Sequence, residues 1–264
     1  VSMARELGIK KLATPSAGNA GGAMAAYAAA GGMEANIFMP RDVPEANYIE
    51  SKLCGANVTL VDGLISDCGR IVAERKDAEG WFDLSTLKEP YRIEGKETMG
   101  LELAEQLGSE LPEWVVASVG DGCSIAGLVR GLEEALAAGL TDHLPRVLGV
   151  QAAGAAPLVA AAQSGAEPRI NDAQTIADSL CVGVPRNPDK ALAAVARTNG
   201  AWVAVTDEQI LAALPATAAR TGIFGEPAAV TAAAGVRVAV EQGIIDPTAG
   251  VAIIISGNGL KDPA

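Results

Sequence analysis

The sequence Thr14-Pro15-Ser16-Ala17-Gly18-Asn19-Ala20-Gly21-Gly22 joins a short apolar segment, residues 9–13, to an alanine-rich segment, residues 23–30. The first segment predicts a strand and the second a helix, because alanine is the strongest helix former. A strand that turns through Ser, Gly and Asn into a helix directs several backbone N–H groups at one point, where the helix dipole favours an anion. The loop is therefore either an ordinary strand-to-helix turn or one wall of an anion-binding site.

A second polar loop, Gly120-Asp121-Gly122-Cys123-Ser124, stands between a predicted strand at 114–119 and a predicted helix at 125–138. A dinucleotide-binding loop would have its third glycine where Ile125 stands, and the next strand would end in an acidic residue rather than in Gln151. A P-loop would continue into Gly-Lys-Ser/Thr, which this loop does not contain. A short run of amides with a serine hydroxyl at a helix start suits a single phosphate monoester.

Strand-like and helical segments alternate along the chain, which is the pattern of parallel sheets covered on both faces. The polar segment 81–93 interrupts the alternation, and a helix from Glu97 to Leu107 follows it. The sequence therefore predicts an α/β fold of two doubly wound parallel-sheet lobes, residues 1–107 and 108–264. The last strand, 251–255, is an apolar run typical of a central position, and a third polar loop, 256–262, follows it. Because ligands bind at the carboxyl ends of parallel strands, we expect the three loops to line one cleft.

Composition excludes several classes of protein. The 264 residues carry a net charge of −12, which argues against nucleic acid as a partner. No apolar run is long enough to span a bilayer, and no signal peptide opens the sequence. The cysteines show no metal-ligand spacing and no disulfide framework, and the single histidine, His143, is expected in a solvent-facing loop. We expect a cytoplasmic enzyme without a metal. The cysteines are Cys54, Cys68, Cys123 and Cys181.

The three loops and two further motifs resemble the fold-type II pyridoxal-phosphate-dependent enzymes and, within them, the threonine synthase family. The motifs are Ser-Ala-Gly-Asn-Ala-Gly at 16–21, Glu-Pro-Tyr-Arg-Ile-Glu-Gly-Lys at 89–96, the loop at 120–124, Gly-Glu-Pro at 225–227 and Ser-Gly-Asn-Gly-Leu-Lys-Asp at 256–262. The resemblance implies pyridoxal 5'-phosphate as cofactor, a homodimer, and conversion of O-phosphohomoserine and water into threonine and phosphate.

The resemblance also implies roles for individual residues. The substrate carboxylate would be held by backbone amides of the first loop, and Asn19 would in addition meet the phenolic oxygen of the cofactor. The second loop would hold the cofactor phosphate, with the Asp121 side chain in water, and Ser256 would meet the pyridine nitrogen. A neutral hydroxyl does not force that nitrogen to be protonated, which suits elimination and replacement over transamination. The loop residues are Ser16, Ala17, Gly18, Asn19 and Ala20, and then Gly120, Asp121, Gly122, Cys123 and Ser124.

The sequence departs from the family pattern at the lysine that binds the cofactor covalently. Family members hold the cofactor as a Schiff base on a lysine shortly before the first loop, in a Ser-Phe-Lys-like stretch, and no residue before Ser16 matches it. Because the sequence opens inside a predicted helix and not with Met, we expect that lysine upstream of Val1, and the chain as given then lacks it. Lys10, Lys11, Lys96 and Lys261 stand at other places in the pattern. Three hypotheses stay open: a threonine synthase-like lyase, a threonine or serine dehydratase-like enzyme, and a non-catalytic remnant or partner subunit.

Overall fold

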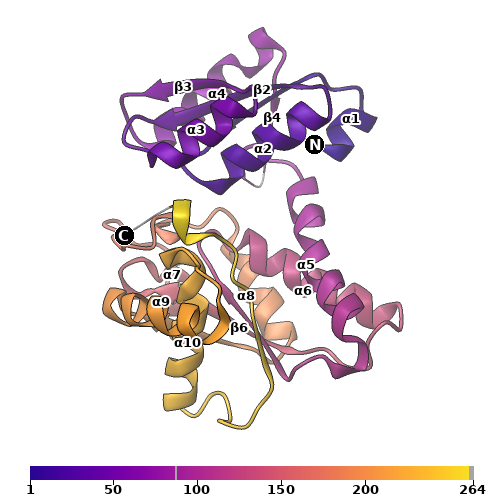
Figure 1. Ribbon diagram of the computed structural model, residues 1–264, viewed down its shortest axis with the longest axis vertical. Coiled ribbons are helices and arrows are strands. Elements are labelled where there is room, and N and C mark those ends of the chain that lie inside the picture. Colours follow the sequence, from indigo (N-terminus) through magenta and orange to yellow (C-terminus); the bar gives the residue numbers. More distant parts are fainter. Residues whose placement is uncertain (87, 262–264) are drawn as a thin grey trace. The chain divides into compact units, whose positions relative to one another are not determined.

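A computed structural model describes residues 1–86 and 88–261 and shows an α/β protein (Figure 1). The chain divides into two compact units, Val1–Tyr91 and Arg92–Ala264. The predicted fold class is confirmed. The division lies before the boundary that the sequence predicts after Leu107, because the helix α5 (Tyr91–Leu107) packs against the second unit's helix α6 (Cys123–Ala137). Asp262, the last residue of the third predicted loop, lies outside the described residues.

The first unit contains a four-stranded parallel sheet in the order β3-β2-β1-β4. Its two faces are buried in different cores, because successive side chains of a strand point in opposite directions. Leu12 of β1 packs with Met24 and Ala28 of α2, whereas its neighbour Ala13 packs with Cys68 of α4. The elements are α1 (Ser2–Glu6), β1 (Lys11–Pro15), α2 (Asn19–Ala30), β2 (Glu34–Pro40), α3 (Glu45–Leu53), β3 (Asn57–Val61), α4 (Ile65–Glu79) and β4 (Phe82–Asp83).

The second unit contains a four-stranded parallel sheet in the order β7-β6-β5-β8. Apart from α5 and α6, its helices and strands are β5 (Trp114–Ser118), β6 (Arg146–Ala152), α7 (Pro157–Ser164), α8 (Pro188–Arg197), β7 (Ala201–Val205), α9 (Asp207–Thr221), α10 (Pro227–Glu241) and β8 (Val251–Ile253). Short 3-10 turns lie at Gly108–Glu110, Ala153–Ala155, Asp178–Leu180 and Gly259–Lys261.

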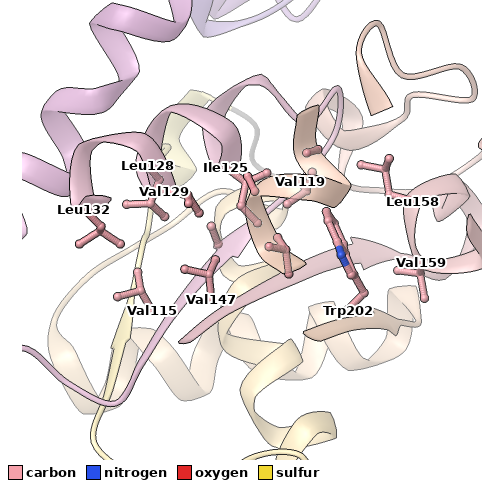
Figure 2. Close-up of a cluster of buried hydrophobic side chains, with 14 of the residues drawn as sticks. Val115, Val119, Ile125, Leu128, Val129, Leu132, Val147, Leu158, Val159 and Trp202 are labelled. Atoms are coloured by element: carbon pink, nitrogen blue, oxygen red, sulfur yellow. The ribbon is translucent and has the colours of Figure 1, made fainter. Parts of the chain in front are cut away.

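The α6 helix covers one face of this second sheet. Its apolar side chains, among them Ile125 and Leu128, point at Val115 and Val147 of the strands (Figure 2). The opposite face packs against α10, where Val116 of β5 meets Ala232. Because both faces are buried, the strands of this unit are nearly continuous apolar runs rather than alternating ones.

The position of β8 corrects the sequence prediction. An apolar run at 251–255 was expected to be a central strand, but β8 has only three residues and ends the strand order beside β5. Ile253 is 38% exposed, as an edge position allows. In the described part of the chain, no helix has the length and apolar character needed to cross a bilayer.

Candidate active site

Each sheet reverses its strand order at one point, and the predicted loops lie at these points. In the first unit the order reverses between β1 and β4, and the loop of residues 16–20 follows β1. In the second unit it reverses between β5 and β8, which are parallel neighbours, and the loops 120–124 and 256–261 follow them. Ligands of open α/β sheets bind at such reversals, outside the carboxyl ends of the strands. The structure therefore brings two predicted loops together in the second unit.

The first loop is shaped by the Ser16 hydroxyl. Gly18, the N-cap of α2, has no side chain that could cap the helix, and the buried Ser16 Oγ accepts the Gly21 N–H instead, at 2.9 Å. The Ser16 N–H donates to the Phe38 carbonyl at 3.0 Å and so belongs to the sheet. This differs from the expectation that the Ser16 amide binds the substrate carboxylate. The Gly18 N–H also donates within the loop, to the Ser16 Oγ at 3.4 Å. The role of residues 17–20 stays a prediction.

Asn47 fixes the other side of this loop. Its side chain is 6% exposed and its Nδ2 donates to the Ala17 carbonyl at 3.1 Å. The Asn47 backbone carbonyl in turn accepts the Ser51 hydroxyl, at 2.9 Å. This hydrogen bond from a buried amide holds the Ala17 carbonyl in place. The sequence contains no signal that connects positions 17 and 47.

The second loop is a tight turn that only glycine fits. Gly122 has φ +88°, a left-handed conformation, and a Cβ there would lie 2.5 Å from the Ala191 Cβ. At Gly120 a Cβ would lie 3.2 Å from the Ser179 carbonyl oxygen. Gly122 is also the N-cap of the fifteen-residue helix α6, and no side-chain cap hydrogen bond forms there. This backbone fits a phosphate group, which favours the amides and the positive end of a helix dipole.

The Asp121 side chain does not extend into open water, contrary to the sequence prediction. It is half-buried, and this loss of hydration raises the pKa of its carboxyl group. The charges of Arg186 and Arg92, a hydrogen bond from the Arg186 backbone and the charge of Lys96 all act in the opposite direction. Three basic residues therefore act on the charge of Asp121 in the phosphate-type loop, residues 120–124. Sequence reasoning missed them as site residues, although Arg92 and Lys96 stand in the quoted motif at 89–96.

Gln151 supports the strand end that leads into this loop. Its fully buried side chain donates to the Val119 carbonyl at 3.2 Å and accepts the N–H groups of Leu158 at 2.8 Å and Val159 at 3.1 Å. One amide therefore satisfies the residue before Gly120 and the start of α7. Gln151, which stands where a dinucleotide-binding protein has an acidic residue, therefore stabilises the backbone around this loop.

The third loop pairs with the Gly-Glu-Pro motif. Gly225 and Asn258 form an antiparallel bridge, and the Glu226 N–H donates to the Gly257 carbonyl at 3.0 Å. The Glu226 carboxyl is so close to Gly257 that a Cβ there would lie 2.2 Å from it. Two motifs that are separate in the sequence thus become one element, which holds the residues that follow Ser256.

His143 and the cysteines do not form a site among the described residues. His143 is exposed in a loop beside Asp142, as predicted, with its Nδ1 2.7 Å from the carboxylate. The cysteines are free thiols, and Cys123 is buried at the start of α6. No group of His, Cys, Asp and Glu in residues 1–86 and 88–261 is arranged to hold a metal ion.

Comparison with protein families places this geometry in one class. Residues 1–257 match the model of the family described as "Pyridoxal-phosphate dependent enzyme". The chain belongs to this family, and its cofactor is pyridoxal phosphate.

Among the members of this family, the chain is similar in sequence to threonine synthases. The chain is 36% identical to threonine synthase of Methanosarcina acetivorans and 34% identical to threonine synthase of Methanocaldococcus jannaschii. Each alignment covers 100% of this chain and 65% of the relative. The chain thus spans just under two thirds of the length of these relatives.

Solved structures show the same fold. A fungal L-serine ammonia-lyase from Rhizomucor miehei superimposes with a TM-score of 0.81 at 20% identity, covering 97% of this chain and 81% of that one. The processed form of threonine deaminase isoform 2 from Solanum lycopersicum superimposes with a TM-score of 0.79 at 23% identity, covering 94% of this chain and 69% of that one.

Proposed function

We propose that this chain forms part of a threonine synthase-like lyase that converts O-phosphohomoserine and water into threonine and phosphate. The observation that carries the proposal is the likeness to threonine synthases over the whole chain, combined with the glycine turn at the start of α6. When bound, pyridoxal phosphate supplies an electron sink for bond changes next to the amino group of the substrate.

We assign the residues of the loops as follows. The backbone of residues 120–124 holds the cofactor phosphate, and Ser256, three residues after the neighbouring strand β8, donates to the pyridine nitrogen. The amides of residues 17–20 hold the substrate carboxylate, and Asn19 contacts the phenolic oxygen of the cofactor. The neighbouring strand ends of β5 and β8 support the first two assignments. The Ser16 hydroxyl supports the third, because it keeps the turn before α2 in one conformation.

No lysine of this chain is assigned to the cofactor's aldehyde. Lys10 precedes β1 and Lys11 opens it, at the amino end of the strand, whereas the loops follow carboxyl ends. Lys96 lies on α5, where it interacts electrostatically with Asp121 and Cys123 of the loop at 120–124, the predicted phosphate site. We therefore expect reversible binding of pyridoxal phosphate without a single covalently labelled lysine.

The test measures products from two substrates in the presence of pyridoxal phosphate. Phosphate and threonine released from O-phosphohomoserine, faster than with the cofactor alone, support the proposal. Ammonia and 2-oxobutanoate from threonine instead favour the dehydratase hypothesis. Because no lysine of this chain is assigned to the cofactor's aldehyde, cofactor binding without either reaction favours the non-catalytic hypothesis only if it persists after a segment that carries the family's lysine is added before Val1. A cofactor that does not bind refutes the assignments of residues 120–124, Ser256 and Asn19.

We further propose that the protein is a cytoplasmic homodimer that acts on a small molecule. The support is the resemblance to the family and the acidic net charge of −12, which is unsuited to nucleic acid. Light scattering at high protein concentration tests the dimer, and a monomer there contradicts it.

A further inference from the structure

The seam between α5 and α6 brings Lys96 to the phosphate-type loop. Three glycines let the two backbones approach: a Cβ at Gly131 would lie 2.0 Å from the Glu97 carbonyl oxygen, and one at Gly100 would lie 2.5 Å from the Leu128 carbonyl oxygen. A Cβ at Gly127 would lie 2.6 Å from the Lys96 Cβ. The stem of Lys96 therefore lies on α6 one turn after Cys123.

The direction of the Lys96 side chain follows from helix geometry. Contacts advance together along both helices, from Lys96 with Gly127 to Glu97 with Gly131, so α5 and α6 run in the same sense. Side chains on a helix lean toward its N-terminus. Lys96 therefore leans toward the start of α6, in agreement with its electrostatic interactions with Cys123 and Asp121.

The Lys96 ammonium interacts with acidic groups over a distance rather than through a hydrogen bond. In the described part of the chain no hydrogen bond or ion pair at contact distance engages its Nζ, and the side chain is half-buried. Asp121, the nearby acid, is balanced mainly by Arg186 and Arg92. A half-buried ammonium without a hydrogen-bonded counter-charge is unfavourable, and an anion that reaches it relieves that cost.

We propose that Lys96 is a ligand of the phosphate group held by residues 120–124. This inference rests on the proposed function, because it adds a charged side chain to the same cradle. The ligand class is a phosphate monoester dianion. Lys96 supplies a positive charge to the phosphate, whereas the backbone N–H groups of residues 120–124 position the phosphate.

Proton uptake is the distinguishing property of such a ligand. Loss of hydration lowers the pKa of Lys96, and Arg92 acts in the same direction, whereas Cys123 and Asp121 oppose them. A bound dianion next to Nζ raises the pKa again. A phosphate monoester is a dianion above its second pKa of about 6. At a pH above the pKa of Lys96 in the free protein, phosphate binding therefore takes up a proton, and affinity falls as the pH rises.

The test is calorimetric titration of the chain with pyridoxal phosphate, inorganic phosphate and pyridoxal, between about pH 7 and about pH 10, just below lysine's reference pKa. Lys96→Gln removes the charge and Lys96→Arg keeps it at every pH in this range. Lys52→Gln, at an exposed position of α3, is the matched control for a lost charge. Circular dichroism establishes that each variant is folded.

At pH 7 we expect K96Q to bind both phosphate-bearing probes about tenfold more weakly, the lower range of a charge-assisted hydrogen bond. Pyridoxal, which has no phosphate group, should bind equally to wild type and K96Q. The wild-type affinity should fall toward the K96Q value at high pH, while the affinities of K96Q and K96R stay level. K52Q should behave as wild type.

Two results overturn the inference and leave the proposed function standing. One is an unchanged phosphate affinity in K96Q. The other is an alkaline loss of affinity that persists in K96R, because a group other than Lys96 would then be titrating. A wild-type chain that binds no phosphate-bearing probe refutes the proposed function and this inference together. If K96Q does not fold, the pH dependence of wild type is compared with that of K96R. A loss of affinity at high pH in wild type but not in K96R supports the inference, and the same loss in both contradicts it.

Discussion

Replacing Gly131 by alanine tests whether the α5–α6 seam is as close as the structure shows. The new methyl carbon would lie 2.0 Å from the Glu97 carbonyl oxygen and 2.9 Å from its carbonyl carbon. These atoms are backbone, so no side chain can turn away, and the helices must separate by about an ångström to reach ordinary contact. Overpacking of this kind costs about 1–3 kcal/mol.

Helix propensity opposes this cost. Alanine stabilises a helix interior by about 1 kcal/mol relative to glycine. Because the obstacle is a second helix whose neighbouring contacts at Gly100 and Gly127 must also open, we place the cost at the upper end of its range. The expected net loss for Gly131→Ala is about 2 kcal/mol in the free energy of unfolding.

Gly95→Ala is the matched control on the facing helix. No atom lies within 4 Å of a Cβ at Gly95, so this variant keeps the propensity gain without the overlap, and its stability should rise by up to about 1 kcal/mol. Urea unfolding followed by tryptophan fluorescence measures both variants. Trp114 and Trp202 report on the second unit, and a Trp81→Phe background removes the signal of the first.

Phosphate affinity provides a second measurement on the same variant. Separation of the helices moves Lys96 away from residues 120–124, so folded Gly131→Ala should bind pyridoxal phosphate more weakly than Gly95→Ala. The reasoning is refuted if Gly131→Ala is as stable as Gly95→Ala, because the seam must then be looser than the structure shows.

Three further changes test the groups that support the loops. Gln151→Leu leaves a buried carbonyl and two buried N–H groups without partners, so unfolding should become easier by about 3 kcal/mol or more in thermal denaturation; a loss below about 1 kcal/mol would contradict the buried contacts. Ser16→Ala removes the side-chain acceptor that the Gly21 N–H uses beside the Gly18 carbonyl and should cost about 1 kcal/mol in the same assay, whereas an unchanged midpoint would show that the turn does not need the hydroxyl. Burial raises the pKa of the Glu97 carboxyl, so its ionised form weakens the folded state above the unfolded-state pKa, and Glu97→Gln should unfold at a higher temperature at neutral pH. That advantage should disappear as the pH falls below about 4, and a Glu97→Gln variant that is less stable at neutral pH would show that the pair with Arg130 outweighs burial.

The loops were predictable from the sequence because their signals are local. A serine, glycines and an asparagine between an apolar run and an alanine-rich run define a strand-to-helix turn, and β1 and α2 flank that turn in the structure. The same reasoning located the turn between β5 and α6 at residues 120–124. Nothing beyond the neighbouring residues is needed to form such a turn.

Features that depend on distant partners were not predictable in this way. An apolar run reads the same in the centre of a sheet and at its edge, so β8 was placed wrongly. The Ser16 amide is committed to Phe38, a residue on another strand. Asp121 loses water because of its surroundings in the fold, which include Arg186. In each case the deciding partner is far away in the sequence.

The glycines of the α5–α6 seam lie between these two cases. Gly127 and Gly131 are one helical turn apart, a spacing visible in the sequence that permits close approach of a second helix. The sequence does not say which helix approaches, and without that knowledge Lys96 is one lysine among several. Once α5 is known to be the partner, the depth of the seam determines how far the Lys96 stem lies from the start of α6. Gly100, Gly127 and Gly131 therefore determine how close the Lys96 charge lies to the proposed phosphate site, although these glycines contact no ligand themselves. Variants at these glycines should change phosphate affinity even though the loop at 120–124 is intact.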